Sequence, residues 1–342
     1  MLQADDIITL AAERYRLQAP LACSAYGVIW RAAALSGKTE VALKLINRAQ
    51  MERAQPFLQA RWVASAEREI AFLRSLAPWD ERHIVRLLDS GKHDGLPVMA
   101  LELMERDLAR HLHHNAPAPA QVLDWIGQIN QALAKVHQYG WLYLDLKPAN
   151  VLLTHHGEAR LADFGTNRLR AALPAGEYAG TASWQAPEQF FAGAGQRYDT
   201  DVRTDYFALG AMFYFLVTGA VPLRFCADCG AAYREHGTGA AAALMARHGG
   251  MLAQTLAPDE AALFRQRFIA PRGDDGTWCP ADASAANAAL ALLRSLLAAE
   301  RSERPAHALQ ISRMIGAIRT RLQPGRDTRY ALPLRSANES YA

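Results

Sequence analysis

Three oxygen-bearing side chains that could take part in metal and proton chemistry lie close together in the sequence. They are Asp145, Asn150 and Asp163. Carboxylate and amide oxygens are the ligands that Mg²⁺ prefers, and a carboxylate can also accept a proton from a reacting hydroxyl. Each residue has an ordinary explanation as well, because Asp163 precedes a glycine as turn residues do and Asn150 could cap a helix. The residue types therefore permit this chemistry without establishing it.

A glutamate in the first quarter of the chain indicates a second charged group. Apolar residues recur at helical spacing over residues 56–76, and Glu69 falls on the same stripe. Leaving a buried carboxylate unpaired would cost several kcal/mol, so Glu69 needs a cation. We expect a lysine from a neighbouring strand to supply it.

The elements that must position these residues change in type along the chain. Short strand-like runs over residues 13–45, and another over 96–103, predict a small antiparallel sheet. A long amphipathic helix over 122–136 ends before Gly140, and most of the later chain has a helical pattern. The segment 225–290 is rich in alanine and glycine and is hard to assign. We therefore predict an α+β fold.

Composition excludes several classes of protein. A chain of 342 residues is too long for a disulfide-stapled miniprotein, and 37 Lys and Arg against 34 Asp and Glu give a formal charge of only +3. That charge gives no reason to expect a nucleic-acid partner. Four cysteines favour a reducing compartment, and the N-terminus lacks a secretory signal, so we expect a cytoplasmic protein.

An uncharged stretch over residues 206–223 has two interpretations. Its length approaches that of a membrane-spanning helix, whereas Gly219, Pro222 and the flanking Asp205 favour a buried helix of a large domain. We expect the buried helix and no membrane span.

Ordered motifs across nearly the whole chain give these residues a common context. Residues 41–44 read Val-Ala-Leu-Lys, 143–150 read Tyr-Leu-Asp-Leu-Lys-Pro-Ala-Asn, 163–165 read Asp-Phe-Gly and 186–188 read Ala-Pro-Glu. In this order and spacing they resemble the eukaryotic-type (Hanks-type) serine/threonine protein kinases. The resemblance implies a protein-kinase-like bilobal fold, with a small antiparallel β lobe that carries one main helix and a larger, mainly α-helical lobe.

The same resemblance implies limits for the parts of the chain. They are an N-terminal extension over 1–12, a small lobe over 13–104, a large lobe over 105–322 with an insertion at about 225–290, and a loose tail over 323–342.

ATP and Mg²⁺, or Mn²⁺, are the implied cofactors. The implied catalytic residues are Asp145, Lys147, Lys44 and Glu69, and the metal ligands are Asn150 and Asp163. In this family the strand lysine contacts the α- and β-phosphates and pairs with the helix glutamate, which matches the need of Glu69 for a cation. The aspartate of the catalytic loop, here Asp145, accepts or orients the proton of the substrate hydroxyl.

The implied nucleotide site draws on both lobes, with Leu101 as the gatekeeper before a hinge whose backbone recognises adenine. The implied cofactor-binding residues are Leu21, Ala22, Ser24, Gly27, Val28, Ala42, Lys44, Glu102, Met104, Asp107, Asn150, Leu152 and Asp163.

Further motifs imply a protein substrate. Residues 180–181 (Gly-Thr) and 186–188 are similar to the end of a peptide-binding activation segment, and Arg304 matches the arginine that pairs with the glutamate of that segment. Asp205 matches the aspartate that holds the backbone of the catalytic loop. Lys147 together with the threonine resembles the serine/threonine pattern, so Ser and Thr hydroxyls are the expected acceptors.

The glycine-rich loop over residues 21–28 departs from the family. Ala22 and Ser24 replace two of its three glycines, and only Gly27 remains. Because glycine lets backbone amides approach phosphates closely, we expect reduced nucleotide affinity.

The catalytic loop departs as well, since Tyr143 and Leu144 replace His-Arg. No arginine beside the catalytic aspartate can then collect a phosphate on the activation segment. Between Gly165 and Gly180 the only hydroxyl residues are Thr166 and Tyr178. We expect constitutive activity or control by a regulatory protein partner.

Two weaker hypotheses concern cysteines. Cys226, Cys229 and Cys279, with His236 or His248, could form a structural Zn²⁺ site, although ordinary part-buried thiols are the simpler interpretation. Cys23, in the glycine-rich loop, could sense redox state, but no activating base is visible.

Two alternatives to a protein kinase stay open. A pseudokinase would keep the fold as a nucleotide-binding scaffold, and a small-molecule kinase would share only the nucleotide site. The intact charged residues argue against the first, and Thr181 with residues 186–188 argues against the second.

Overall fold

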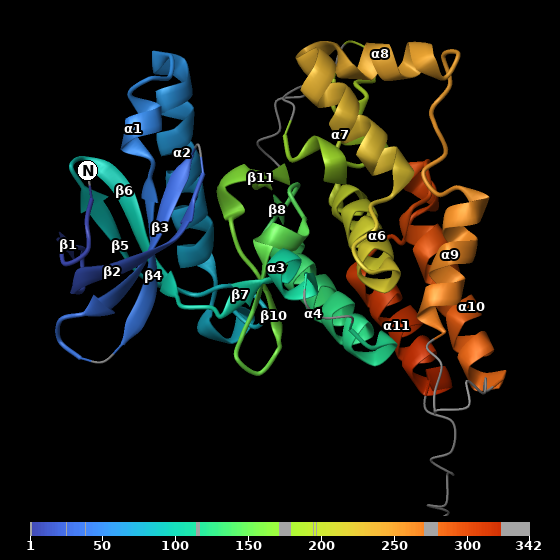
Figure 1. Cartoon of the computed structure of the whole chain (residues 1–342), viewed down its shortest axis with the longest axis horizontal. Helices are drawn as coiled ribbons and strands as arrows, with labels where there is room; N and C mark the ends of the chain where they lie inside the picture. The colour runs from blue at the N-terminus through green and yellow to red at the C-terminus, as the bar shows by residue number, and fades with distance from the viewer. Residues whose placement is uncertain are drawn as a thin grey trace, which may run out of the picture.

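Strands of the first hundred residues gather at one end of the molecule, and most of the helices lie at the other (Figure 1). The structure is a computed structural model that describes residues 2–24, 26–37, 39–113, 117–170, 179–193, 195, 197–269 and 280–322. The predicted bilobal arrangement is confirmed. The expected tail over 323–342 lies outside the described residues.

The small lobe is built on an antiparallel sheet of six strands in the order β1-β2-β3-β4-β6-β5. The strands are β1 (Ile7–Thr9), β2 (Arg14–Cys23), β3 (Gly27–Ala34), β4 (Glu40–Ile46), β5 (Leu87–His93) and β6 (Leu96–Glu102). Side chains alternate along β4, so Leu43 enters the core of the sheet while Ala42 and Lys44 point to the opposite face. There they pair with Leu101 and Met99 of β6. This face looks toward the large lobe.

Residues 1–12, expected to form an N-terminal extension, contribute an edge strand instead. β1 pairs with β2 through Ile8 and Tyr15, and Ile8 is fully buried. The carboxylate of Asp89 on β5 accepts hydrogen bonds from the amides of Ala12 and Glu13 at 3.1 Å each. The segment therefore belongs to the small lobe.

One long helix lies between the sheet and the large lobe. The short α1 (Arg48–Met51) leads into α2 (Pro56–Ser75), which starts with proline at its first turn. Among its residues only Glu69, Phe72 and Leu73 are buried. The position of α2 therefore depends on a few contacts near its C-terminal half.

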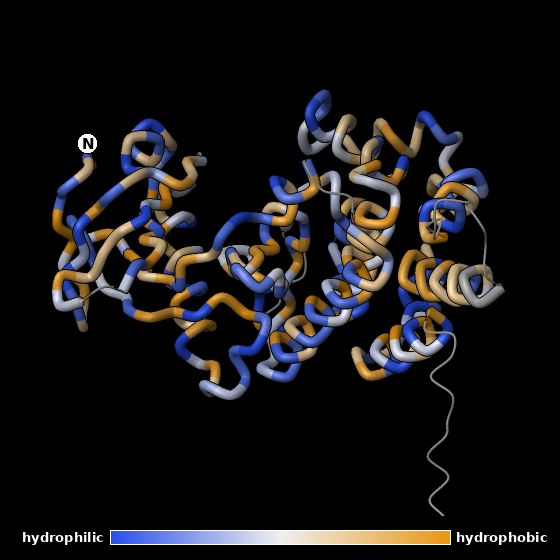
Figure 2. The backbone as a smooth tube through the Cα atoms, turned by 60° about the horizontal axis from the view of Figure 1, so that its bottom comes forward, coloured by the Kyte–Doolittle hydropathy of each residue, from blue (hydrophilic) through white to orange (hydrophobic). Residues whose placement is uncertain are grey.

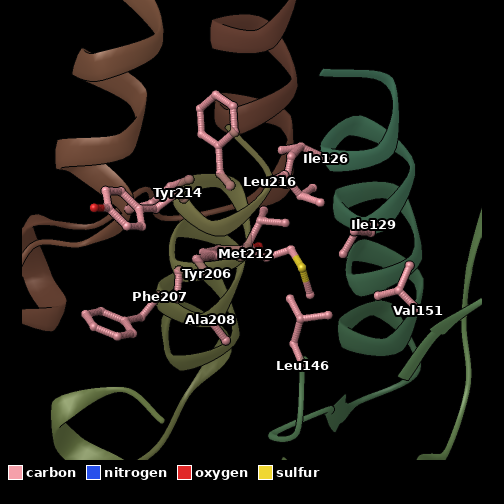
Figure 3. Packing of buried hydrophobic residues seen from close by; sticks show 14 of the residues in the cluster. Ile126, Ile129, Leu146, Val151, Tyr206, Phe207, Ala208, Met212, Tyr214 and Leu216 are labelled. Carbon is pink, nitrogen blue, oxygen red and sulfur yellow. The ribbon is translucent and has the colours of Figure 1, made fainter. Parts of the chain in front are cut away.

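The large lobe packs around α4 (Pro119–Gln138) and α6 (Val202–Thr218). Figure 3 shows Met212 of α6 directed toward Ile129 of α4 and Leu146. Asp201 caps α6 by accepting from the amide of Arg203 at 2.7 Å. The remaining elements are β7 (Arg106–Asp107), α3 (Leu108–Leu112), β8 (Trp141–Leu142), β9 (Val151–Leu153), β10 (Ala159–Leu161), β11 (Arg168–Leu169), α5 (Pro187–Phe190), α7 (Arg224–His236), α8 (Ala240–Arg247), α9 (Pro258–Phe268), α10 (Pro280–Leu296) and α11 (Ala308–Leu322).

The described part of the alanine- and glycine-rich segment is mainly helical and contributes α7, α8, α9 and the start of α10. Along the coloured part of the tube, hydrophobic and hydrophilic residues are interspersed over short distances (Figure 2). The uncharged stretch near residue 206 forms α6, whose side chains are almost all buried. In the ranges given above, no helix is long and apolar enough to cross a membrane.

The hypothesis of a zinc site is not supported by the structure. Cys226 and Cys229 lie on α7 with their side chains in the large core. Burial raises the pKa of Cys226 to about 12 and raises that of Cys229 as well, which disfavours the thiolate that binds zinc. Cys279 lies outside the described residues. Among the residues that the structure does describe, no three His, Cys, Asp or Glu side chains form a group that could hold a metal.

Two helical glycines of the large lobe should respond in opposite ways to alanine. A Cβ on Gly210 would lie 2.8 Å from the Cβ of Leu296, whereas one on Gly316 would meet nothing within 4 Å. We expect Gly210→Ala to lower the free energy of unfolding by about 1–3 kcal/mol through overpacking. We expect Gly316→Ala to raise it by about 0.5–1 kcal/mol. Urea denaturation of both variants checks this, and a stabilised Gly210→Ala protein would contradict the close approach of α6 and α10.

Candidate active site

Lys44 contacts two carboxylates, one on α2 of the small lobe and one from the large lobe. Lys44 Nζ lies 2.7 Å from Glu69 Oε2 on α2 and 2.8 Å from Asp163 Oδ1. Burial opposes the charge of Lys44, but Asp163 and Glu69 raise its pKa overall. Lys44 in turn lowers the pKa of Asp163, while burial raises the pKa of Glu69. The sequence prediction that Glu69 would meet a strand lysine agrees with this geometry.

The Asp-Phe-Gly segment (residues 163–165) is fixed by both its backbone and its ring. The Phe164 amide donates to Glu69 Oε1 at 3.2 Å. The Phe164 ring lies 4.6 Å from the ring of Phe72 on α2 and 5.2 Å from that of Tyr143. Asp163 adopts a left-handed conformation (φ 57°) that turns the chain here. Its carboxylate stays half-exposed beside Lys44.

Asp145 is the centre of a second polar cluster. Its Oδ1 accepts the hydroxyl of Thr181 at 2.7 Å, and its Oδ2 lies 2.8 Å from Lys147 Nζ. Lys147 also donates to Thr181 Oγ1 at 2.8 Å. The side-chain amide of Asn150 donates to the carbonyl of Asp145 at 2.9 Å, which leaves its amide oxygen as the atom suited to a metal. Lysine, threonine and aspartate thus meet as the sequence pattern suggested.

The backbone around Asp145 is held by a buried aspartate. Asp205, at the start of α6, accepts from the amides of Tyr143 at 3.0 Å and Leu144 at 2.7 Å. His137 Nε2 contacts the same carboxylate at 2.8 Å. Leu144 has a positive φ of 65°, a conformation that is costly for a leucine and that these bonds support.

The segment after the undescribed residues 171–178 is anchored to the large lobe. Arg304 binds Glu188 in a bidentate pair of 2.7 and 2.9 Å, and its side chain is fully buried. Gly180 packs so closely that a Cβ there would lie 2.4 Å from the carbonyl oxygen of Leu144. The predicted pairing of Glu188 with Arg304 is therefore present.

The side chains of the predicted hinge residues contact other parts of the protein. Leu101 faces the Lys44 side of the sheet opposite Ala42. Glu102 accepts from the Arg86 amide at 2.9 Å and pairs with Arg160 through its carboxylate. Its own amide donates to the Arg86 carbonyl at 3.0 Å, so both the side chain and the amide of Glu102 are already engaged. Asp107 caps α3 by accepting from the Arg110 amide at 2.8 Å. The other two predicted residues of this region, Met104 and Leu152, are part-buried against the large core.

One predicted residue lies on the wrong face of the sheet. Val28 pairs with Leu45 and packs against the outer core of the small lobe. Ile29 pairs with Lys44 and with Ala22, so Ile29, and not Val28, lies on the face of the sheet that carries Lys44. The alternation along the strand, counted from Lys44 once the pairing is known, would have identified Ile29.

The turn between β2 and β3 has its own hydrogen bonds. The Ser24 hydroxyl accepts from the amides of Tyr26 at 3.2 Å and Gly27 at 3.0 Å. Asn47 Nδ2 donates to the carbonyl of Ser24 at 2.8 Å, and the Tyr26 ring lies 5.1 Å from the ring of Trp62 on α2. Leu21 sits at an irregularity in the pairing of β2 with β3. The Asn47 and Trp62 contacts were not predicted from sequence.

The two-lobed fold, with a lysine charge chain between the lobes, is that of the protein kinases. The model of the protein kinase domain matches residues 23–314, and the chain belongs to this family.

Individual relatives agree with the family. The chain is 29% identical over 231 residues to the serine/threonine-protein kinase PknL of Mycobacterium tuberculosis, with 66% of the chain and 54% of the relative covered. It is 31% identical over 237 residues to the DNA damage-responsive serine/threonine-protein kinase RqkA of Deinococcus radiodurans, with 66% of the chain and 33% of the relative covered. The chain thus spans about half the length of the first relative and a third of the second.

Proposed function

We propose that this chain is a protein kinase that transfers the γ-phosphoryl group of Mg-ATP to serine or threonine hydroxyls of proteins. The observation that carries the proposal is the contact of Asp145 with the Thr181 hydroxyl and Lys147. Thr181 presents an aliphatic hydroxyl to the carboxylate, and a substrate serine or threonine would present the same group. Lys147, 2.8 Å from that carboxylate, is placed to offset negative charge on the transferred group.

The other residues fit a bound nucleotide. Mg-ATP would supply the phosphoryl group and part of the charge neutralisation. Asp163, half-exposed, and the amide oxygen of Asn150 would hold the metal, since hard oxygen ligands suit Mg²⁺. Lys44 keeps its positive charge near neutral pH because its pKa is raised, and it would bind the α- and β-phosphates.

The acceptor is a protein in this proposal, and its identity is not specified by the fold. The relatives named as serine/threonine-protein kinases and the buried pair of Glu188 with Arg304 support a peptide-binding segment over a small-molecule site. We also propose a cytoplasmic location, where ATP is abundant. A pseudokinase is the competing function, because the turn of Ser24 differs from a glycine-rich loop.

Removal of the two aspartates tests the activity. We expect Asp145→Ala to lower kcat by about 10²–10⁴-fold, as for loss of a general base, and Asp163→Ala to abolish metal-dependent turnover. The assay measures transfer from labelled ATP and Mg²⁺ to a generic protein substrate. Asp124→Ala, which changes an exposed aspartate of α4, is the matched control and should retain activity. Equal incorporation by wild type, Asp145→Ala and Asp163→Ala would reject the assignment, and no transfer by wild type despite ATP binding would favour a pseudokinase.

Nucleotide affinity tests the turn at Ser24. The Ser24 hydroxyl accepts hydrogen bonds from the backbone amides of Tyr26 and Gly27. Backbone amides of this kind can bind phosphate when they have no other partner. We expect the double variant Ala22→Gly, Ser24→Gly to bind ATP about fivefold more tightly, an effect about the size of one neutral hydrogen bond. Ser36→Gly, in the turn between β3 and β4, is the control with the same change away from the cleft. Titration of ATP that gives unchanged or weaker binding in the double variant rejects the idea.

The residue before Asp145 bears on how the activity is regulated. It is Leu144, where many kinases carry an arginine. We propose that activity needs no phosphate on the activation segment and is either constitutive or controlled by a protein partner. Phosphatase treatment of purified protein should leave kcat unchanged. Mass spectrometry verifies that phosphate has been removed. Abolished activity after treatment would show that a phosphate is needed after all.

A further inference from the structure

A serine on α2 ties this helix to the Asp-Phe-Gly segment. Ser65 lies one helical turn before Glu69, and its hydroxyl donates to the carbonyl oxygen of Gly165 at 2.6 Å. Glu69 accepts from the neighbouring Phe164 amide at 3.2 Å. Two successive residues of the segment are thus bonded to two successive turns of one helix.

The bond between Ser65 and Gly165 depends on a hydroxyl at position 65 and on the absence of a side chain at position 165. A Cβ on Gly165 would lie 2.6 Å from the Ser65 hydroxyl oxygen, so a larger residue would exclude it. The Arg68 guanidinium is a second, more distant donor to the same carbonyl, at 3.4 Å. The carbonyl therefore faces donors from α2, and Ser65 supplies the short bond.

This bond matters because α2 has few other anchors. Its buried residues are Glu69, Phe72 and Leu73, and they lie C-terminal to Ser65. If α2 rotated or moved outward, Glu69 would leave Lys44, and Phe164 would lose its backbone partner. The Ser65 hydroxyl opposes this movement of α2, because its bond to Gly165 lies N-terminal to the buried residues of the helix.

We propose that Ser65 is a positioning residue that holds α2 against the Asp-Phe-Gly segment and so keeps Lys44, Glu69 and Asp163 in their catalytic arrangement. The inference rests on the proposed kinase activity and deepens it. In this proposal the bond between Ser65 and Gly165 helps to align the site, a role that a phosphate on the activation segment would otherwise share. A negative charge at position 65 would oppose the arrangement, because it would face the Gly165 carbonyl and repel Glu69 four residues later.

Three variants test the role in turnover. We expect Ser65→Ala to lower kcat about fivefold with the KM for ATP little changed. Ser65→Thr, which keeps a hydroxyl, should restore most of the activity, and Ser65→Asp should lose more than Ser65→Ala. Ser75→Ala is the matched control, since Ser75 is also on α2 and its hydroxyl bonds within the helix, to the Phe72 backbone carbonyl at 2.6 Å, and not to the segment. Equal losses of kcat in Ser65→Ala and Ser75→Ala would reduce Ser65 to a general structural role and overturn the proposal.

Amide hydrogen exchange tests the contact without relying on catalysis. In the absence of nucleotide, Ser65→Ala should exchange faster than wild type at Phe164 and Gly165, whereas Ser75→Ala should match wild type there. Unchanged exchange at both amides would overturn the proposal. If wild type transferred no phosphate but this difference appeared, the positioning contact would stand and the proposed kinase activity would fail.

Discussion

The charge of Lys44 must be shared between two carboxylates that come from different parts of the chain, and the rest of the site depends on this constraint. Burying Glu69 without a cation would cost several kcal/mol, so Lys44 must stay between the sheet and α2 while Glu69 is buried. Asp163 completes the chain from the large lobe. The relative placement of the lobes is thus an electrostatic requirement as well as a packing one.

Much of the site could be predicted from the sequence because its charged residues need partners of opposite charge. Glu69 on an apolar helical stripe required a cation, because an unpaired buried charge is so costly. The pairing of Glu188 with Arg304, over a long sequence separation, was expected only from the resemblance of the motifs to those of the kinase family. Lys147 and Asp145, two residues apart, needed only a local turn to meet.

Other features depend on information that only the folded chain contains. Whether Val28 or Ile29 faces the cleft is decided by the pairing with β4, and one residue of register exchanges the two faces. Ile7–Thr9 is too short a strand to be recognised before its neighbour is known. Cys226 and Cys229 have a spacing that suits a metal, yet on a helix the same spacing directs both thiols into one core. The bonds of Ser65 and Asn47 likewise join residues whose pairing no motif records.

The carboxylate of Glu102 gives the hinge an ionic character. It contacts Arg86, which leads into β5 of the small lobe, and Arg160 on β10 of the large lobe. A rotation of one lobe against the other must stretch at least one of these two pairs. Dissolved ions screen the half-exposed pair with Arg86 more than the largely buried pair with Arg160, so the stiffness of the joint depends on ionic strength through Arg86.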